Sequence, residues 1–219
     1  MNFDTAFVFK AIPILFEGLG VTLLLVGGSL LIGIVIGIVG CYGKLLGRGP
    51  LSWLAHAYVG IFRSLPETVL IFWIYFCGPL VLNVRLSPLG SGLLALALVA
   101  GAYLTEIFRS GVASVPRGQL EAARALGLKP YRRLRHIIAP QAVMTMLPTV
   151  IGFVTILLKN SALVSAIGLG ELFYRAMTLS ATTYKYFEIY TAVGIMYFCV
   201  IFPLSMISQR IERRRQVRK

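Results

Sequence analysis

Four stretches of the sequence, each at least 20 residues long, contain no charged side chain. They cover residues 18–43, 86–105, 137–158 and 189–209. About 20 apolar residues in a helix are enough to cross the hydrocarbon core of a bilayer, which is about 30 Å thick. Each stretch therefore predicts a transmembrane helix, and we expect an all-α membrane protein.

A fifth apolar segment, residues 49–84, carries Arg63 and Glu67 near its middle. As one helix it would be about 50 Å long, which is too long for a simple crossing. Ser64 and Glu67 have the spacing of a capping box, with Pro66 in the first turn. We therefore expect a low-angle helix over residues 51–62 and a new helix from residue 65. The predicted architecture is one transmembrane domain over residues 1–219 with five spans, at about 18–43, 65–82, 86–105, 137–158 and 189–209.

The composition excludes several classes of protein. Hydrophobic residues make up 58% of the chain and charged residues 13%, and the mean hydropathy is +0.83. Soluble domains carry about 25% charged residues, so a soluble enzyme or a disordered chain is excluded. The three cysteines and two histidines lack the spacing of metal ligands, so we expect no metal site and no bound cofactor.

The positive charge gathers on one side of the predicted membrane. Of the 21 lysines and arginines, 15 fall in the loop after the first span, the loop after the third span and the C-terminal tail. Four fall on the other side, and Arg63 and Lys159 lie in or near the membrane. The positive-inside rule then places the N-terminus outside and the C-terminus in the cytoplasm. This orientation, with membrane lipid around the helices, accounts for most of the net charge of +13 without a nucleic-acid partner.

The long basic loop, about residues 114–136, has the pattern of two short helices. Strong helix formers occupy residues 119–125, Gly127 stands where a left-handed cap would end that helix, and Pro130 can begin a second one. Such a helix-turn-helix could lie on anionic lipid headgroups or bind a partner protein, and composition leaves both open.

The same loop contains a pattern of Glu121-Ala122-Ala123, then Gly127, then Ile137–Pro140. This pattern resembles the EAA loop of the permease subunits of bacterial ATP-binding-cassette (ABC) importers, with Ala139 in place of the usual leucine. Further similarities to the branch that transports polar amino acids lie in residues 58–66, 106–111, 118–119 and 158–164. The sequence departs from this branch at two places. Ser64-Leu65 stands where Gly-Thr is commoner, although some permeases resembling glutamate/aspartate systems share it. Asn160 stands in place of a frequent aspartate.

The resemblance implies a type I ABC importer permease fold in the bacterial inner (plasma) membrane. It implies that Glu121, Ala122, Ala123 and Gly127 belong to a coupling loop that docks on a cytoplasmic ABC ATPase. It also implies a second permease subunit, identical or homologous, and an extracytoplasmic amino-acid-binding protein. The chain has no G-x-x-x-x-G-K-[ST] phosphate loop, so we expect a non-catalytic subunit whose partner binds ATP and magnesium.

Polar side chains in an apolar zone are the candidates for contact with substrate, because they are costly there. Glu67 could meet an ammonium group or cap its helix, and residues 159–161 could be an ordinary helix end. Glu106 and Arg109 are three residues apart and could form a salt bridge at the membrane edge. The predicted substrate-pathway residues are Arg63, Ser64, Glu67, Lys159, Asn160 and Ser161.

Three functions remain open at this stage. The first is import of a polar amino acid driven by a partner ATPase, with glutamate or aspartate slightly favoured as substrate. The second is a small channel or secondary carrier without an ATPase, for which we would expect internal repeats or ionisable residues at mid-span. The third is a membrane scaffold, which would not need the polar groups at Arg63 and Lys159–Ser161.

Overall fold

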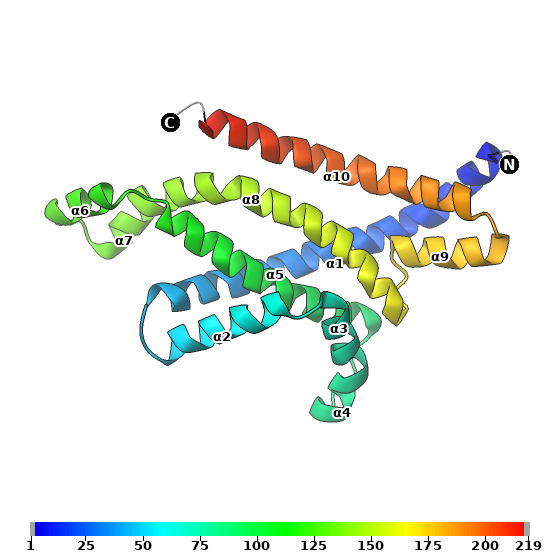
Figure 1. The fold of residues 1–219 in the computed structure, drawn as a ribbon, viewed down its shortest axis with the longest axis horizontal. Helices are drawn as coiled ribbons and strands as arrows, with labels where there is room; N and C mark the ends of the chain where they lie inside the picture. The colour runs from blue at the N-terminus through cyan, green and yellow to red at the C-terminus, as the bar shows by residue number, and fades with distance from the viewer. Residues whose placement is uncertain (1–2, 217–219) are drawn as a thin grey trace.

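The computed structural model describes residues 3–216, which contain helices and connecting turns but no strand. Four long helices run side by side in Figure 1, namely α1 (Thr5–Leu45), α5 (Pro88–Ala113), α8 (Ala139–Asn160) and α10 (Tyr186–Gln216). At one end, here called the loop end, lie α6 (Arg117–Ala125), α7 (Pro130–Arg133) and a π-helical turn η2 (Leu134–Ile138). At the opposite end lie a 3₁₀ turn η3 (Ser161–Ile167) and α9 (Leu172–Thr183).

The remaining segment is the broken helix. α2 (Pro50–Ser64) runs back from the loop end, and α3 (Glu67–Phe72) then turns away. A π-helical turn η1 (Trp73–Cys77) and α4 (Gly78–Leu82) continue the projection. The bend between residues 50–64 and residues 67–81 is 105°.

Length and composition support the predicted number of crossings. Within the described residues, four helical segments are long and apolar enough to span a membrane: Thr5–Leu45, Pro88–Ala113, Pro130–Ile167 and Tyr186–Arg213. The bent pair brings the number to five if it counts as one span. α1 begins at the end opposite the loop, and α10 ends on the side of the loop end (Figure 1).

Small residues on α1 allow it to lie close against α5. A Cβ added to Gly33 would stand 2.7 Å from the Cβ of Ala100, and one added to Gly37 would stand 2.8 Å from the Cβ of Leu104. Close backbone approach through small residues is a general way to pack helices in lipid. The small-residue stripe of α1 is thus used for packing within the chain. The opposite face of α1 exposes apolar side chains such as Leu31, as a lipid-facing surface requires.

The predicted capping box at Ser64 is wrong. Ser64 is the last residue of α2, and α3 begins at Glu67 with Pro66 at its N-cap and no side-chain cap hydrogen bond. Leu65 is extended, with φ −79° and ψ 136°. A proline disfavours the helical region for the residue before it, so the break falls at Leu65 and the new helix starts two residues later than expected.

The structure contains helical residues outside the predicted spans, where charged side chains interrupt the apolar sequence. α1 already begins at Thr5, where the Asp4 carboxylate caps it by accepting from the Phe7 amide at 3.0 Å. Glu17 does not interrupt the helix, since its side chain is exposed and its Oε2 lies 3.5 Å from Arg175 Nη2 of α9. α9 was not predicted, because Glu171 and Arg175 interrupt the apolar pattern there. Glu171 is nevertheless fully buried as the N-cap of α9, where its carboxylate accepts from the Tyr174 amide at 2.7 Å.

Candidate functional site

The bend between α2 and α3 brings Glu67 to the end of α8. The Asn160 side chain, at the last residue of that helix, lies close enough to the Glu67 carboxylate to interact with it electrostatically. Both residues are partly buried. Two of the predicted pathway residues, 93 positions apart in the sequence, therefore form one polar site.

Arg63 lies on the other side of the bend, at the end of α2. Its guanidinium carbon stands 5.1 Å from the centroid of the Tyr103 ring on α5, a cation–π contact. Tyr103 in turn stacks on Phe153 of α8, with ring centroids 5.3 Å apart. This row of aromatic rings ties the three helices together beneath an exposed arginine.

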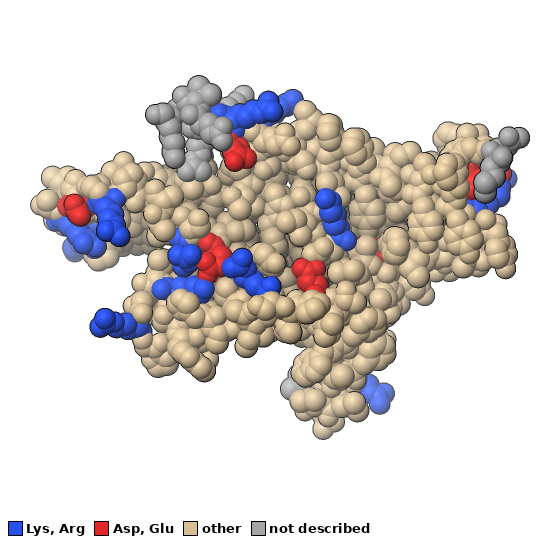
Figure 2. Space-filling model, in the orientation of Figure 1, with Lys and Arg blue, Asp and Glu red and all other residues tan. Residues whose placement is uncertain are grey.

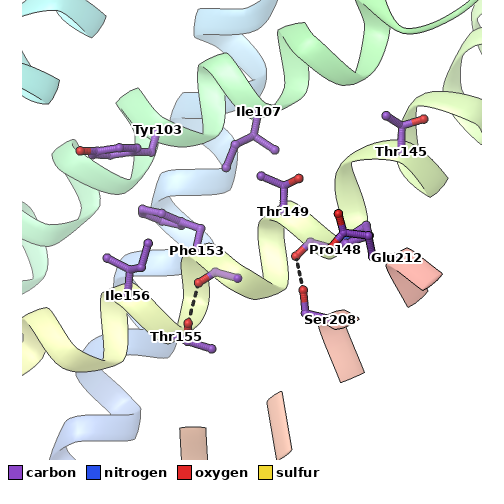
Figure 3. A pocket seen from close by; sticks show the side chains of 11 residues that line it. Tyr103, Ile107, Thr145, Pro148, Thr149, Phe153, Thr155, Ile156, Ser208 and Glu212 are labelled. Carbon is purple, nitrogen blue, oxygen red and sulfur yellow. Dashed lines mark hydrogen bonds between the residues drawn. The ribbon is translucent and has the colours of Figure 1, made fainter. Parts of the chain in front are cut away.

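Two adjoining cavities continue from these rings toward the loop end. Cavity A, of about 530 Å³, lies between α5, α8 and α10. In Figure 3, Tyr103 and Ile107 of α5 lie next to Thr149 and Phe153 of α8. Ser208 and Glu212 come from α10. Cavity B, of about 420 Å³, shares Ile107, Thr145 and Thr149 with cavity A and is otherwise lined by Arg63, Glu106, Arg109, Ser110, Gly111 and Met146.

An ion-pair network forms one wall of cavity B. The Glu106 carboxylate accepts from Arg109 through Nε at 3.0 Å and Nη2 at 2.8 Å, which confirms the predicted salt bridge. Its other oxygen accepts from Lys44 at the end of α1, a contact the sequence did not indicate. Figure 2 shows charged side chains of both signs gathered over this part of the molecule, surrounded by uncharged surface.

The other predicted pathway residues are placed differently. Lys159 and Ser64 are exposed. Ser161 is fully buried, and its hydroxyl donates to the carbonyl of Leu158 at 2.7 Å. The structure thus brings Glu67 and Asn160 together and places Arg63 on a cavity, whereas Ser161 faces the interior of the bundle.

The loop at the end of the bundle has the predicted helix-turn-helix form. Gly127 has φ +66°, and two hydrogen bonds close the turn: Gly127 N–H to Arg124 C=O at 2.9 Å and Leu128 N–H to Ala123 C=O at 3.1 Å. This is the Schellman arrangement, which requires a left-handed residue after the helix. The expectation of a left-handed cap at Gly127 is confirmed.

One face of α6 is anchored and the other is open. Ala123 is 2% exposed, and Gln141 of α8 donates to the side chain of Gln119 at 2.6 Å. Glu121 and Ala122 are exposed, and so is Leu126, at 78%. Leu126 therefore adds apolar surface at the end of α6. The cations Arg218 and Lys219, which entered the charge count above, lie outside the described residues.

These features define a polytopic membrane protein. It has apolar helices, a broken helix that brings charged groups into the apolar zone, and an exposed helical loop. The chain belongs to the family described as "Binding-protein-dependent transport system inner membrane component", whose family model matches residues 29–217.

Individual relatives agree with this assignment. The chain is 34% identical to an arginine transport system permease protein, ArtQ, of Bacillus subtilis (98% of each chain covered). It is 32% identical to a glutamate/aspartate import permease protein, GltK, of Escherichia coli O157:H7 (97% of this chain and 98% of that protein covered). Its fold matches a chain in a crystal structure of an amino acid ABC transporter with histidines, at a TM-score of 0.89 and 33% identity, with 98% of this chain and 100% of that chain covered. The predicted importer-permease fold is confirmed.

Proposed function

We propose that this chain is the permease subunit of an ATP-driven importer that moves a polar amino acid across the bacterial inner membrane. The observation that carries the proposal is the break at Leu65, which presents Arg63 and Glu67 on two sides of a bend inside an apolar segment. Irregular backbone at membrane depth is tolerated where it is buried in protein or lines a water-filled cavity. Charged groups retained there mark the path of a polar substrate.

The two sides of the bend suit the two charged groups of an amino acid. Arg63 offers a planar donor fork to a carboxylate, and Glu67 with Asn160 offers oxygen acceptors to an ammonium group. Lys159 and Arg63 outweigh the single acid Glu67, and an amide stands at position 160. This charge balance favours an acidic substrate such as glutamate or aspartate over a cationic one. Ser64 lies beside the path, and Ser161 supports it from the interior.

The exposed face of α6 supports a partner on the loop side. Glu121, Ala122 and Leu126 form a small surface with one acid, a close-approach residue and an apolar side chain. Gly127 fixes the direction in which this surface points. In this proposal the partner is a cytoplasmic ABC ATPase that binds ATP and magnesium, and the loop end and C-terminus face the cytoplasm.

Further partners complete the proposal. Five spans are too few to enclose a pathway, so a second permease subunit, identical or homologous, forms its other wall. A binding protein on the opposite side delivers the amino acid. The alternative, a channel or carrier working without an ATPase, would leave the open face of α6 without a role.

Arg63 provides the direct test of the pathway. Arg63→Ala should lower ATP-dependent uptake into proteoliposomes about tenfold or more, because a hydrogen bond to a charged group contributes about 1.5–3 kcal/mol. Arg63→Lys should restore little, since an ammonium cannot form the planar fork. Arg48→Ala is the matched control, an exposed arginine near the loop end that lines neither cavity. Normal uptake by Arg63→Ala would remove the arginine from the pathway.

A further inference from the structure

Cavity B differs from cavity A in the charge of its lining. Among the described side chains, two arginines, Arg63 and Arg109, and a single acid, Glu106, line cavity B. The described lining of cavity A consists of apolar and hydroxyl side chains and one charged residue, Glu212. The two cavities share a wall at Thr149.

The acid of cavity B does not cancel its two arginines. Lys44 is paired with one oxygen of Glu106, and its side chain is only 9% exposed. The pair of Lys44 and Glu106 is neutral, so Arg109 on the other oxygen leaves the network with a net charge of +1. Arg63 adds a second positive charge to the lining of the cavity.

Both arginines retain donors that could bind a ligand. Among the side chains that the structure describes (residues 3–81 and 83–213), Arg109 uses Nε and Nη2 on Glu106 and its Nη1 group has no partner. Among the same side chains, Arg63 contacts the face of the Tyr103 ring, which leaves its N–H groups available. Guanidinium groups bind carboxylates through paired N–H donors, so two such groups on one cavity form an anion site.

We propose that cavity B is a second binding station, in which Arg63 and Arg109 hold the carboxylate of the transported amino acid between the bend and the loop end. Lys44 and Glu106 are positioning residues: Glu106 fixes the guanidinium of Arg109, and Lys44 neutralises Glu106. The substrate identity rests on the proposed function, whereas the anion preference of the cavity rests on the described side chains alone. Conduction requires a site that attracts the ligand and also releases it, and a cavity exposed to water provides such a site.

The test measures the electrostatic potential of the cavity directly. Thr149, an exposed residue that lines cavity B, is replaced by cysteine in a chain whose three native cysteines are alanine. The purified complex is treated with an anionic and a cationic methanethiosulfonate reagent, and the ratio of the two rates is compared with that of free cysteine. We expect the cavity to favour the anionic reagent, and Arg109→Gln to lower the ratio about fivefold, because one nearby charge acts oppositely on the two reagents.

Two further variants distinguish the loss of a cavity charge from a general effect of the substitution on folding. Arg63→Gln lies outside the network of Glu106 and should lower the ratio in the same direction. Arg48→Gln removes a charge at the same end of the molecule without touching the cavity, and should leave the ratio unchanged. Millimolar L-glutamate should slow the anionic reagent at Thr149→Cys in the parent protein, and slow it less in Arg109→Gln.

The outcomes separate the two proposals. A ratio equal to that of free cysteine, or an equal loss in Arg48→Gln and Arg109→Gln, would overturn the second station. Absence of protection by glutamate, glutamine and arginine alike would also overturn it as a site for the substrate. The proposed function would survive any of these results if Arg63→Ala still lowered ATP-dependent uptake about tenfold or more. It would fail, with the anion preference intact, if the complex showed no ATP-dependent uptake.

Discussion

Valine in place of Gly127 should uncouple the loop from its partner. Gly127 has φ +66°, and its amide and that of Leu128 close the end of α6. Beyond its two chain neighbours, no described atom lies within 4 Å of the position that a Cβ at Gly127 would take, so the substitution creates no clash with the described structure around it. Its entire cost is therefore backbone strain.

The size of that strain follows from the conformation. A residue forced into a sparsely populated backbone region costs about 1–3 kcal/mol, and asparagine tolerates the left-handed region better than β-branched residues do. At about 2 kcal/mol, the observed turn would lose about 30-fold in population relative to other conformations of the loop. Because the apparent affinity of a partner falls with the fraction of competent conformer, ATPase binding should weaken by a similar factor.

The assay is co-purification of the ATPase together with uptake, at equal amounts of permease in the membrane. The loss of ATPase binding and of uptake should be largest with valine at position 127, smaller with alanine and smallest with asparagine. Gly118→Val is the matched control, since Gly118 lies in α6 with open space around it and lacks a positive φ. Normal binding and uptake in Gly127→Val, or equal losses in Gly118→Val, would show that the turn at Gly127 does not set the docking surface.

Three more predictions follow from other contacts. A reporter fused after residue 219 should be active only in its cytoplasmic form, and activity of a periplasmic reporter there would reverse the proposed orientation. Gly33→Leu should destabilise the protein by about 1–3 kcal/mol, because Gly33 lies close against Ala100. Gly20→Leu should not, because Gly20 has open space around it. Equal melting temperatures of the two variants would refute the packing argument. Lys185 donates to the Asp4 carboxylate and holds the pKa of that carboxyl below its usual 3.8. The stabilisation of the fold by this contact is complete above the pKa of Asp4 in the unfolded chain, and it is lost as the pH falls through the pKa in the folded protein. Between about pH 5 and about pH 3, the melting temperature should therefore fall more in the parent protein than in Asp4→Asn, and parallel curves would contradict the assignment.

Features that depend on neighbouring residues could be predicted from the sequence. The spans follow from runs of apolar side chains, and the turn after α6 follows from Gly127 itself, because a Schellman cap is closed by residues within one turn. The salt bridge between Glu106 and Arg109 is likewise a contact between adjacent turns of one helix. In each case the sequence contains all the groups that determine the conformation.

The capping box failed for a local reason that was also visible in the sequence. The spacing of Ser64 and Glu67 matched the motif, but Pro66 restricts Leu65 to extended conformations. The restriction acts on the backbone directly, whereas a side-chain cap contributes only about 1 kcal/mol. The steric effect therefore decides where α2 ends.

Contacts between distant segments could not be predicted. Lys44 was counted among loop cations, yet it lies in the last turn of α1 with its side chain 9% exposed, paired with Glu106, 62 residues away. The partnership of Glu67 with Asn160 depends on the 105° bend, whose direction no local pattern specifies. A single sequence shows which polar residues lie in an apolar segment, but it does not show which of them come into contact in the fold.

Reconstitution tests the central claim most directly. The purified chain is placed in proteoliposomes alone, and separately with its ATPase, its second permease subunit and the binding protein, and uptake of radiolabelled glutamate, glutamine and arginine is measured with and without ATP. The account predicts accumulation of an amino acid only in the complete system with ATP, with glutamate preferred to arginine. Flux through the chain alone, independent of ATP, would contradict it and identify a channel or carrier instead.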